Sequence, residues 1–198
     1  MTIPTSLSSK RRAAAHAGER RGRGWRRTWP AALGVIVAAG TAYGLSDARD
    51  VAPVVIASGV VYLAAAAIGR RAAAWIAFAV AFLLITLDKF AGLDAVPWLF
   101  ALAIALLLTG LIIRRTRPWW AFPLQAAAML AFGAVAYAAV QLSPVVGGLL
   151  VATALLGHAA WDVYHHRAHR VVDRSFAEFC AVLDVLVAAL VVVIALQP

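Results

Sequence analysis

Long apolar blocks separated by short polar connections make up most of the chain after its first 29 residues. None of these blocks has the polar face of an amphipathic helix. Several are near the short end of the ~17–25 residues that a membrane-spanning helix requires. Seven blocks can be drawn: 30–45, 51–68, 72–87, 95–113, 119–142, 144–164 and 176–196. The pattern predicts an all-α protein, a polytopic bundle of seven transmembrane helices that forms one domain over 30–198.

Composition agrees with a membrane protein. Of the 198 residues, 64% are hydrophobic and only 14% are charged, whereas soluble domains average about 25% charged residues. Every apolar block contains Ala, and most also contain Gly. Small residues let helices approach closely in lipid, so we expect a tight bundle.

The positions of the basic residues predict the orientation of the chain. With the N-terminus in the cytoplasm and seven spans, all but two of the 18 Lys and Arg residues fall in cytoplasmic segments. The two exceptions are Arg49 and Lys89. Six or eight spans would break this asymmetry, which follows the positive-inside rule. We therefore expect the N-terminus in the cytoplasm and the C-terminus outside.

The N-terminal segment 1–29 is basic and has no apolar period. Its only acid is Glu19, and it is rich in Ser, Gly and Ala. Such a composition predicts a disordered cytoplasmic tail that contacts anionic lipid headgroups. The net charge of +9 does not indicate nucleic-acid binding, because the basic residues lie in the connections between apolar blocks and the basic tail has no cluster of aromatic residues on which bases could stack. The Ala, Val, Arg and Gly bias is typical of a high-GC bacterial genome, which suggests the bacterial cytoplasmic membrane.

The stretch 157–188 departs from this apolar pattern. His158, Asp162, His165 and His169 are spaced so that they lie within ~60° of one another on a helix. Asp184 follows inside the next apolar block. We expect the sixth helix to continue to about residue 169 or 170.

A turn near residue 171 would make the last two helices an antiparallel hairpin. His158 would then be level with Asp184, ~12 Å below the cytoplasmic surface. Asp162 would be level with Cys180. Ser175, followed three residues later by Glu178, predicts a capping box for the last helix.

Two functional interpretations of this hairpin compete. In the first, His158, Asp162, His165 and Asp184 bind a divalent metal, for which zinc or iron would suit nitrogen and oxygen ligands. In the second, His158 and Asp184, helped by Asp162, form a protonatable pair that relays protons for transport or sensing, because carboxylates within membrane helices usually face the bundle interior and have a function.

Polar residues on other helices extend the second interpretation. Thr109 and Gln125 fall in the same cytoplasmic half of the bundle and are candidates to line a shared cavity.

A structural interpretation and an enzymatic one stand beside these two. His166 and His169 lie at a helix C-terminus, where cations complement the helix dipole, and the His158–Asp184 pair could simply fasten the hairpin. The protein would then be a non-catalytic scaffold or accessory subunit with a membrane-protein partner or a second copy of itself. An intramembrane metal-dependent enzyme ranks third, and the sequence favours a non-enzymatic role.

The motif H-x-x-W-D-x-x-H-H, formed by His158, Trp161, Asp162, His165 and His166, resembles small bacterial multi-pass membrane proteins of unassigned function. The resemblance covers the C-terminal part of the chain and implies no particular activity. Membrane di-iron hydroxylases carry several histidine boxes, whereas this chain has one. Seven-span zinc hydrolases of the ceramidase type draw histidines from separated helices, and this chain lacks those histidines.

Overall fold

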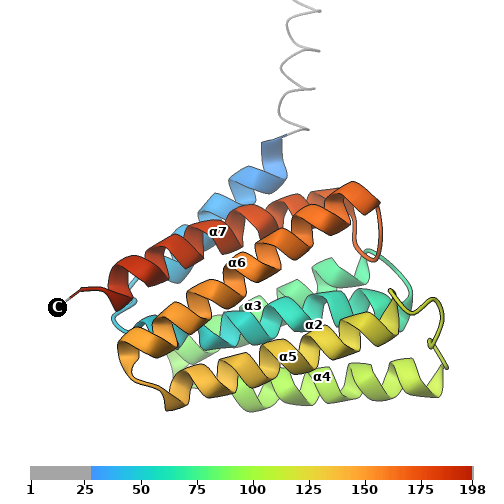
Figure 1. Cartoon of the computed structure of the whole chain (residues 1–198), viewed down its shortest axis with the longest axis horizontal. Coiled ribbons are helices and arrows are strands. Elements are labelled where there is room, and N and C mark those ends of the chain that lie inside the picture. The colour runs from blue at the N-terminus through green and yellow to red at the C-terminus, as the bar shows by residue number, and fades with distance from the viewer. Residues whose placement is uncertain (1–27, 198) are drawn as a thin grey trace, which may run out of the picture.

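The computed structural model describes residues 28–197 (Figure 1). Seven α-helices and one short 3-10 helix make up this part of the chain, and it contains no strand, so the all-α prediction is confirmed. The elements are the Thr28–Ala42 helix, η1 (Ala48–Val51), α2 (Ala52–Ile68), α3 (Ala73–Ala91), α4 (Ala95–Ile112), α5 (Phe122–Gln141), α6 (Pro144–Ala168) and α7 (Arg174–Ala195). The predicted tail 1–29 lies outside the described residues except for Thr28 and Trp29, which begin the first helix.

Six of these helices are long and apolar enough to cross a membrane, counting η1 together with α2. The Thr28–Ala42 helix is apolar but shorter over its described residues. Large apolar side chains are exposed on the outer faces of the bundle, for example Ile76 at 68%, Ile104 at 56% and Leu130 at 65%. Such faces fit contact with lipid and mark a multi-pass membrane protein.

α2 is the central helix of the bundle. Its span is 78% buried, and it packs against α3, α4, α5 and α6. Figure 1 shows α6 and α7 side by side on one side of α2, with α4 and α5 on the other. The Thr28–Ala42 helix packs on α7, where a Cβ atom on Gly34 would lie 2.8 Å from the carbonyl oxygen of Phe179.

Local signals explain where the helices begin and end. Proline occupies the first turn of α2, α5 and α6, where its missing N–H costs little. Gly69 and Gly92 end α2 and α3 in the left-handed conformation, which glycine adopts without steric penalty. The carboxylate of Asp94 caps α4 by accepting a hydrogen bond from the Val96 amide at 3.0 Å.

The hairpin between α6 and α7 is close to the sequence-based expectation, with one error. α6 ends at Ala168 and His169 adopts the left-handed conformation, so the predicted extension of this helix is confirmed. The capping box at Ser175 and Glu178 is wrong, because α7 already begins at Arg174. Asp173 has the extended backbone of an N-cap residue, so Ser175 lies inside the first turn.

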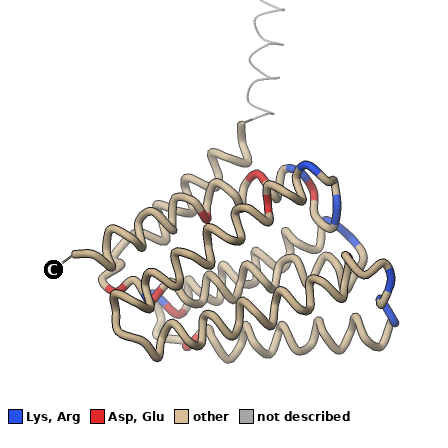
Figure 2. Tube along the Cα trace, viewed as in Figure 1, with Lys and Arg blue, Asp and Glu red and all other residues tan. Residues whose placement is uncertain are grey.

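Charge is distributed unevenly between the two ends of the bundle (Figure 2). The basic end carries Arg70, Arg71, Arg114, Arg115, Arg117, Arg167, Arg170 and Arg174. The opposite end, here called the acidic end, carries Asp47, Asp50, Asp88 and Asp94, and the basic residues described there are Arg49 and Lys89. The candidate site lies between these ends.

Candidate functional site

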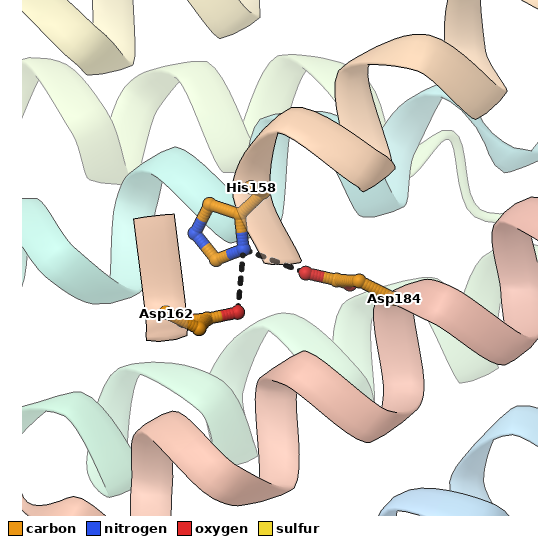
Figure 3. Close-up of side chains that lie close together, drawn as sticks. All are labelled: His158, Asp162 and Asp184. Carbon is orange, nitrogen blue, oxygen red and sulfur yellow. Dashed lines mark hydrogen bonds and ion pairs between the residues drawn. The ribbon is translucent and has the colours of Figure 1, made fainter. Parts of the chain in front are cut away.

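Three buried ionisable side chains meet between α6 and α7 (Figure 3). The Nδ1 atom of His158 lies 2.6 Å from Oδ2 of Asp184 and 3.2 Å from Oδ2 of Asp162. The exposed fractions of the three residues are 1%, 2% and 0%. We call His158, Asp162 and Asp184 the triad.

The two helices bring the triad together by simple geometry. His158 and Asp162 are one turn apart on the same face of α6, and α7 runs antiparallel beside them. The predicted pairing of His158 with Asp184 is therefore confirmed. Small residues help the helices approach, since a Cβ atom on Gly148 would lie only 2.8 Å from that of Ala195.

Tyr62 of α2 completes the surroundings of the triad. Its hydroxyl donates a hydrogen bond to Oδ1 of Asp162 at 2.7 Å, and its ring stands edge-on to the His158 imidazole at 5.3 Å. Sequence reasoning did not identify Tyr62. The available signal was that it follows Ser58 by one helical turn within an otherwise apolar helix.

Two polar atoms of the triad have no hydrogen-bond partner in the described structure, namely Nε2 of His158 and Oδ2 of Asp162. The Nδ1 atom of His158 faces both carboxylates, but it carries at most one proton, and Asp184 is the nearer acceptor. Oδ2 of Asp162 lies 3.2 Å from the same nitrogen but accepts no hydrogen bond from it. Native proteins rarely leave buried polar atoms in this state without a reason.

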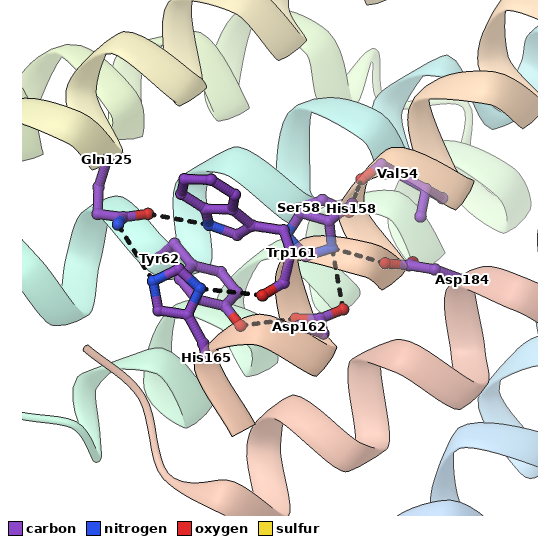
Figure 4. Close-up of polar contacts among 9 residues, drawn as sticks. All are labelled: Val54, Ser58, Tyr62, Gln125, His158, Trp161, Asp162, His165 and Asp184. Carbon is purple, nitrogen blue, oxygen red and sulfur yellow. Dashed lines mark hydrogen bonds and ion pairs between the residues drawn. The ribbon is translucent and has the colours of Figure 1, made fainter. Parts of the chain in front are cut away.

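His165 lies outside the triad, in a second polar cluster (Figure 4). Its Nδ1 donates to the carbonyl oxygen of Trp161 at 3.0 Å, and its Nε2 lies 3.5 Å from the Gln125 amide nitrogen. Gln125 also accepts a hydrogen bond from the Trp161 indole and donates one to the carbonyl of Trp120, each at 3.3 Å. Both imidazole nitrogens of His165 are thus engaged away from the triad.

Tyr62 lies between the two clusters. Its ring is 4.9 Å from the His165 ring and 5.3 Å from the His158 ring. Of the four residues proposed from sequence as metal ligands, the structure brings together His158, Asp162 and Asp184. The fourth, His165, lies on the other side of the Tyr62 ring from the triad.

The other residues that the sequence suggested for the site lie outside the triad. The hydroxyl of Thr109 donates to the carbonyl of Ala105 within α4, at 2.7 Å. Gln125 is fully buried in the second cluster. His169 contacts Arg174 at the basic end, and desolvation together with the charge of Arg174 lowers the pKa of His169. That imidazole is therefore less readily protonated than a free histidine, which weakens its role as a cation at the helix end.

A cavity of about 720 Å³ reaches the triad from the acidic end. It lies among the Thr28–Ala42 helix, α2, α3 and α7. Arg49, Asp50, Asp88 and Lys89 line it at the acidic end, and Asp184 lines it within the bundle. The other two members of the triad are not among its lining residues. Asp184 is therefore the member that faces this cavity.

The arrangement can hold a cation or exchange protons. One nitrogen ligand and two carboxylate oxygens lie within 4.8 Å of one another, and all three side chains are buried. Comparisons of the chain with known protein families, curated proteins and solved structures found no match, so the resemblance carried by the H-x-x-W-D-x-x-H-H motif stays a prediction.

Proposed function

We propose that the protein is a seven-span protein of the bacterial cytoplasmic membrane whose triad binds and releases protons as part of transport or sensing. The basic end lies in the cytoplasm in this proposal, and the C-terminus lies outside. The asymmetry of Lys and Arg between the ends supports this orientation. The basic tail contacts anionic lipid headgroups on the cytoplasmic side.

The observation that carries the proposal is the charge balance of the triad. Two carboxylates share one imidazole, and every described Lys and Arg residue lies at an end of the bundle. With His158 protonated, the triad still has a net charge of −1. An isolated charge in a low-dielectric interior costs several kcal/mol, so one further proton or cation is needed to neutralise the site.

The contacts of the triad suit proton exchange. His158 can pass its Nδ1 proton to Asp184 over 2.6 Å, while Asp162 is held in place by the Tyr62 hydroxyl. Asp184 faces the cavity, which offers a route to the acidic end. A proton entering by this route reaches Asp184 first and His158 next.

Infrared difference spectroscopy of the full chain in lipid tests the proposal directly. A carboxylic-acid C=O band should appear as pH is lowered, shift in D₂O, and disappear in Asp184→Asn or Asp162→Asn. Glu178→Gln is the matched control, because it makes the same carboxyl-to-amide change on α7 outside the triad. A spectrum in which neither triad variant alters a pH-dependent band would refute proton binding there.

A divalent metal is the second candidate, favoured by the convergence of three possible ligand atoms. Imidazole and carboxylate ligands are typical of zinc and of non-haem iron. Elemental analysis of untagged protein, purified without chelator, should then find near-stoichiometric zinc or iron that is lost in His158→Ala. Protein that is metal-free and takes up no added ion would exclude this candidate.

The alternative that the protein is a non-catalytic scaffold, in which the triad only holds α6 and α7 together, makes a different prediction. Variants of the triad would lower expression or stability but would not alter a pH-dependent signal. An enzymatic role would require a substrate that reaches the triad, and the cavity at Asp184 is the route on which to look for it.

A further inference from the structure

We propose that the cavity between the Thr28–Ala42 helix, α2, α3 and α7 binds a hydrophobic organic cation, with its positive charge beside Asp184. The inference rests on the proposed function, since it names the class of ligand that exchanges with the proton of the triad.

The size and walls of the cavity fit an organic molecule. Its volume of about 720 Å³ lies within the range of about 300–1,000 Å³ that is usual for small-molecule sites. A proton route alone needs far less space. Aromatic side chains line the cavity: Tyr43, Phe78, Phe82 and Phe90. Aromatic faces attract cations as well as apolar groups.

The charges that line the cavity favour a cation over an anion. Arg49 is paired with Asp47 at 2.6 Å and also donates to the carbonyl oxygen of Leu142. Lys89 donates to the carbonyl oxygen of Thr41 at 3.0 Å. Both basic groups of the lining are therefore already engaged with acceptors.

The carboxylates of the lining are placed differently. Asp50 and Asp88 lie at the acidic end of the cavity, whereas Asp184 lies inside the bundle. At the acidic end the carboxylates of Asp50 and Asp88 share the lining with Lys89 and with Arg49, whose charge is paired with Asp47, whereas Asp184 is the sole charged residue of the lining inside the bundle. This distribution of charges would draw a cation inward.

Asp184 connects the cavity to the triad. One of its oxygens accepts the short hydrogen bond from His158, and the residue also lines the cavity. Cys180 and Leu183 of α7 line the cavity beside it, and Ser58 lies on the α2 wall. The ligand would thus place its charge near Asp184 and its apolar groups against the surrounding side chains.

Binding of a cation should displace a proton. The triad needs one positive charge beyond that of His158, and a ligand at Asp184 supplies it. The second proton of the triad then leaves for solvent, so the net charge of the site is unchanged.

The titratable, polar and charged groups around Asp184 come from several neighbouring elements. They are His158 and Asp162 on α6, Ser58 and Tyr62 on α2, Cys180 on α7, Asp88 and Lys89 on α3, and Arg49 and Asp50 at η1.

Equilibrium dialysis of the purified full chain in detergent, with tetraphenylphosphonium as the probe, tests the site. Tetraphenylborate has the same shape and the opposite charge, and micelles without protein correct for partitioning. We expect saturable binding of the cation only, weakened as pH falls. Asp184→Asn should weaken binding by about tenfold or more, as expected for the loss of a charged partner, while Glu178→Gln should bind as the unmodified protein does.

The outcomes separate this inference from the proposed function. Equal binding of tetraphenylborate, or full binding by a folded Asp184→Asn variant, would overturn the cation site. Should that variant fail to fold, the contrast between the two probes on the unmodified protein decides the question. Absence of cation binding while the pH-dependent carboxyl band persists would remove the inference and leave the proton function standing. The protein could instead bind the cation saturably but show no pH-dependent carboxyl band and release no proton into weakly buffered solution. That result would refute proton exchange at the triad and the displacement of a proton by the cation, and would leave the cation site standing.

Discussion

The Nδ1 atom of His158 lies 2.6 Å from Oδ2 of Asp184, although 26 residues separate them along the chain. This contact joins α6 to α7 within the bundle, where the two residues are only 1% and 2% exposed. A second carboxylate, that of Asp162, approaches the same nitrogen. The contact therefore fastens two helices and also sets up the charge imbalance on which the proposed chemistry depends.

Replacing His158 by alanine should destabilise the protein strongly. The change leaves Asp162 and Asp184 facing each other without a base, and removing one partner of a buried ion pair typically costs about 3–5 kcal/mol. Unfolding by SDS in mixed micelles, followed by tryptophan fluorescence, would measure the change. The double variant His158→Ala with Asp184→Asn should recover part of the loss. Equal stability of the single and double variants would contradict the charge argument.

Tyr62→Phe tests the contact between α2 and the triad. It removes the hydroxyl that donates to Asp162 at 2.7 Å, so the free energy of unfolding should fall by about 1–2 kcal/mol. The pH-dependent carboxylic-acid band of the triad should also move to a different frequency. Tyr137→Phe is the control, because Tyr137 is 67% exposed, and it should change neither quantity. A shift of similar size in both variants would show that the Tyr62 hydroxyl has no special role.

Gly59 marks a close approach of α2 to α5. A Cβ atom at this position would lie 2.7 Å from Sδ and 3.1 Å from Cα of Met129. Gly59→Ala should therefore cost about 1–3 kcal/mol of stability through overpacking. Gly157 has no heavy atom within 4 Å of such a Cβ, so Gly157→Ala should be neutral or stabilise α6 by about 0.5–1 kcal/mol. If both changes had the same effect, the helices would not be in tight contact at Gly59.

The pair of Asp47 and Arg49 at the acidic end should give a small pH dependence of stability. Hydrogen bonds from Arg49 lower the pKa of Asp47 below its ordinary value of 3.8. A lowered folded-state pKa stabilises the fold above pH 3.8, and this contribution disappears as pH falls through the folded-state value. The thermal midpoint of the unmodified protein should therefore fall more steeply below that pH than that of Asp47→Asn. Parallel curves would indicate that the pair contributes nothing measurable.

The orientation of the bundle can be tested with single cysteines. Cys180 is the sole cysteine of the chain and is buried, so Cys180→Ala provides a suitable background. Ser46→Cys lies at the acidic end and Thr116→Cys at the basic end, and both positions are exposed. A membrane-impermeant maleimide should label the first in intact cells and the second only after lysis. The reverse pattern would invert the proposed topology.

The sequence by itself determined the class of the fold and the asymmetry of its ends. Continuous apolar blocks can only be helices in lipid, because each helix satisfies its own backbone hydrogen bonds. The common level of His158 and Asp184 also followed from local information, since a tight turn fixes which positions of two antiparallel helices are level, but their contact depends on how the two helices are rotated. The start of α7 did not follow, because Asp173 and Ser175 are both plausible caps and only the chain path from α6 distinguishes them.

Tertiary structure alone decided which residues complete the site. His165 shares a face of α6 with His158 but lies two turns away, ~10 Å along the axis, so it meets Gln125 instead of the triad. Tyr62 reaches Asp162 across 100 residues of sequence. The cavity is formed by helices from both halves of the chain. Helical periodicity fixes the face on which a residue lies, whereas the rotation and packing of neighbouring helices determine what that face contacts.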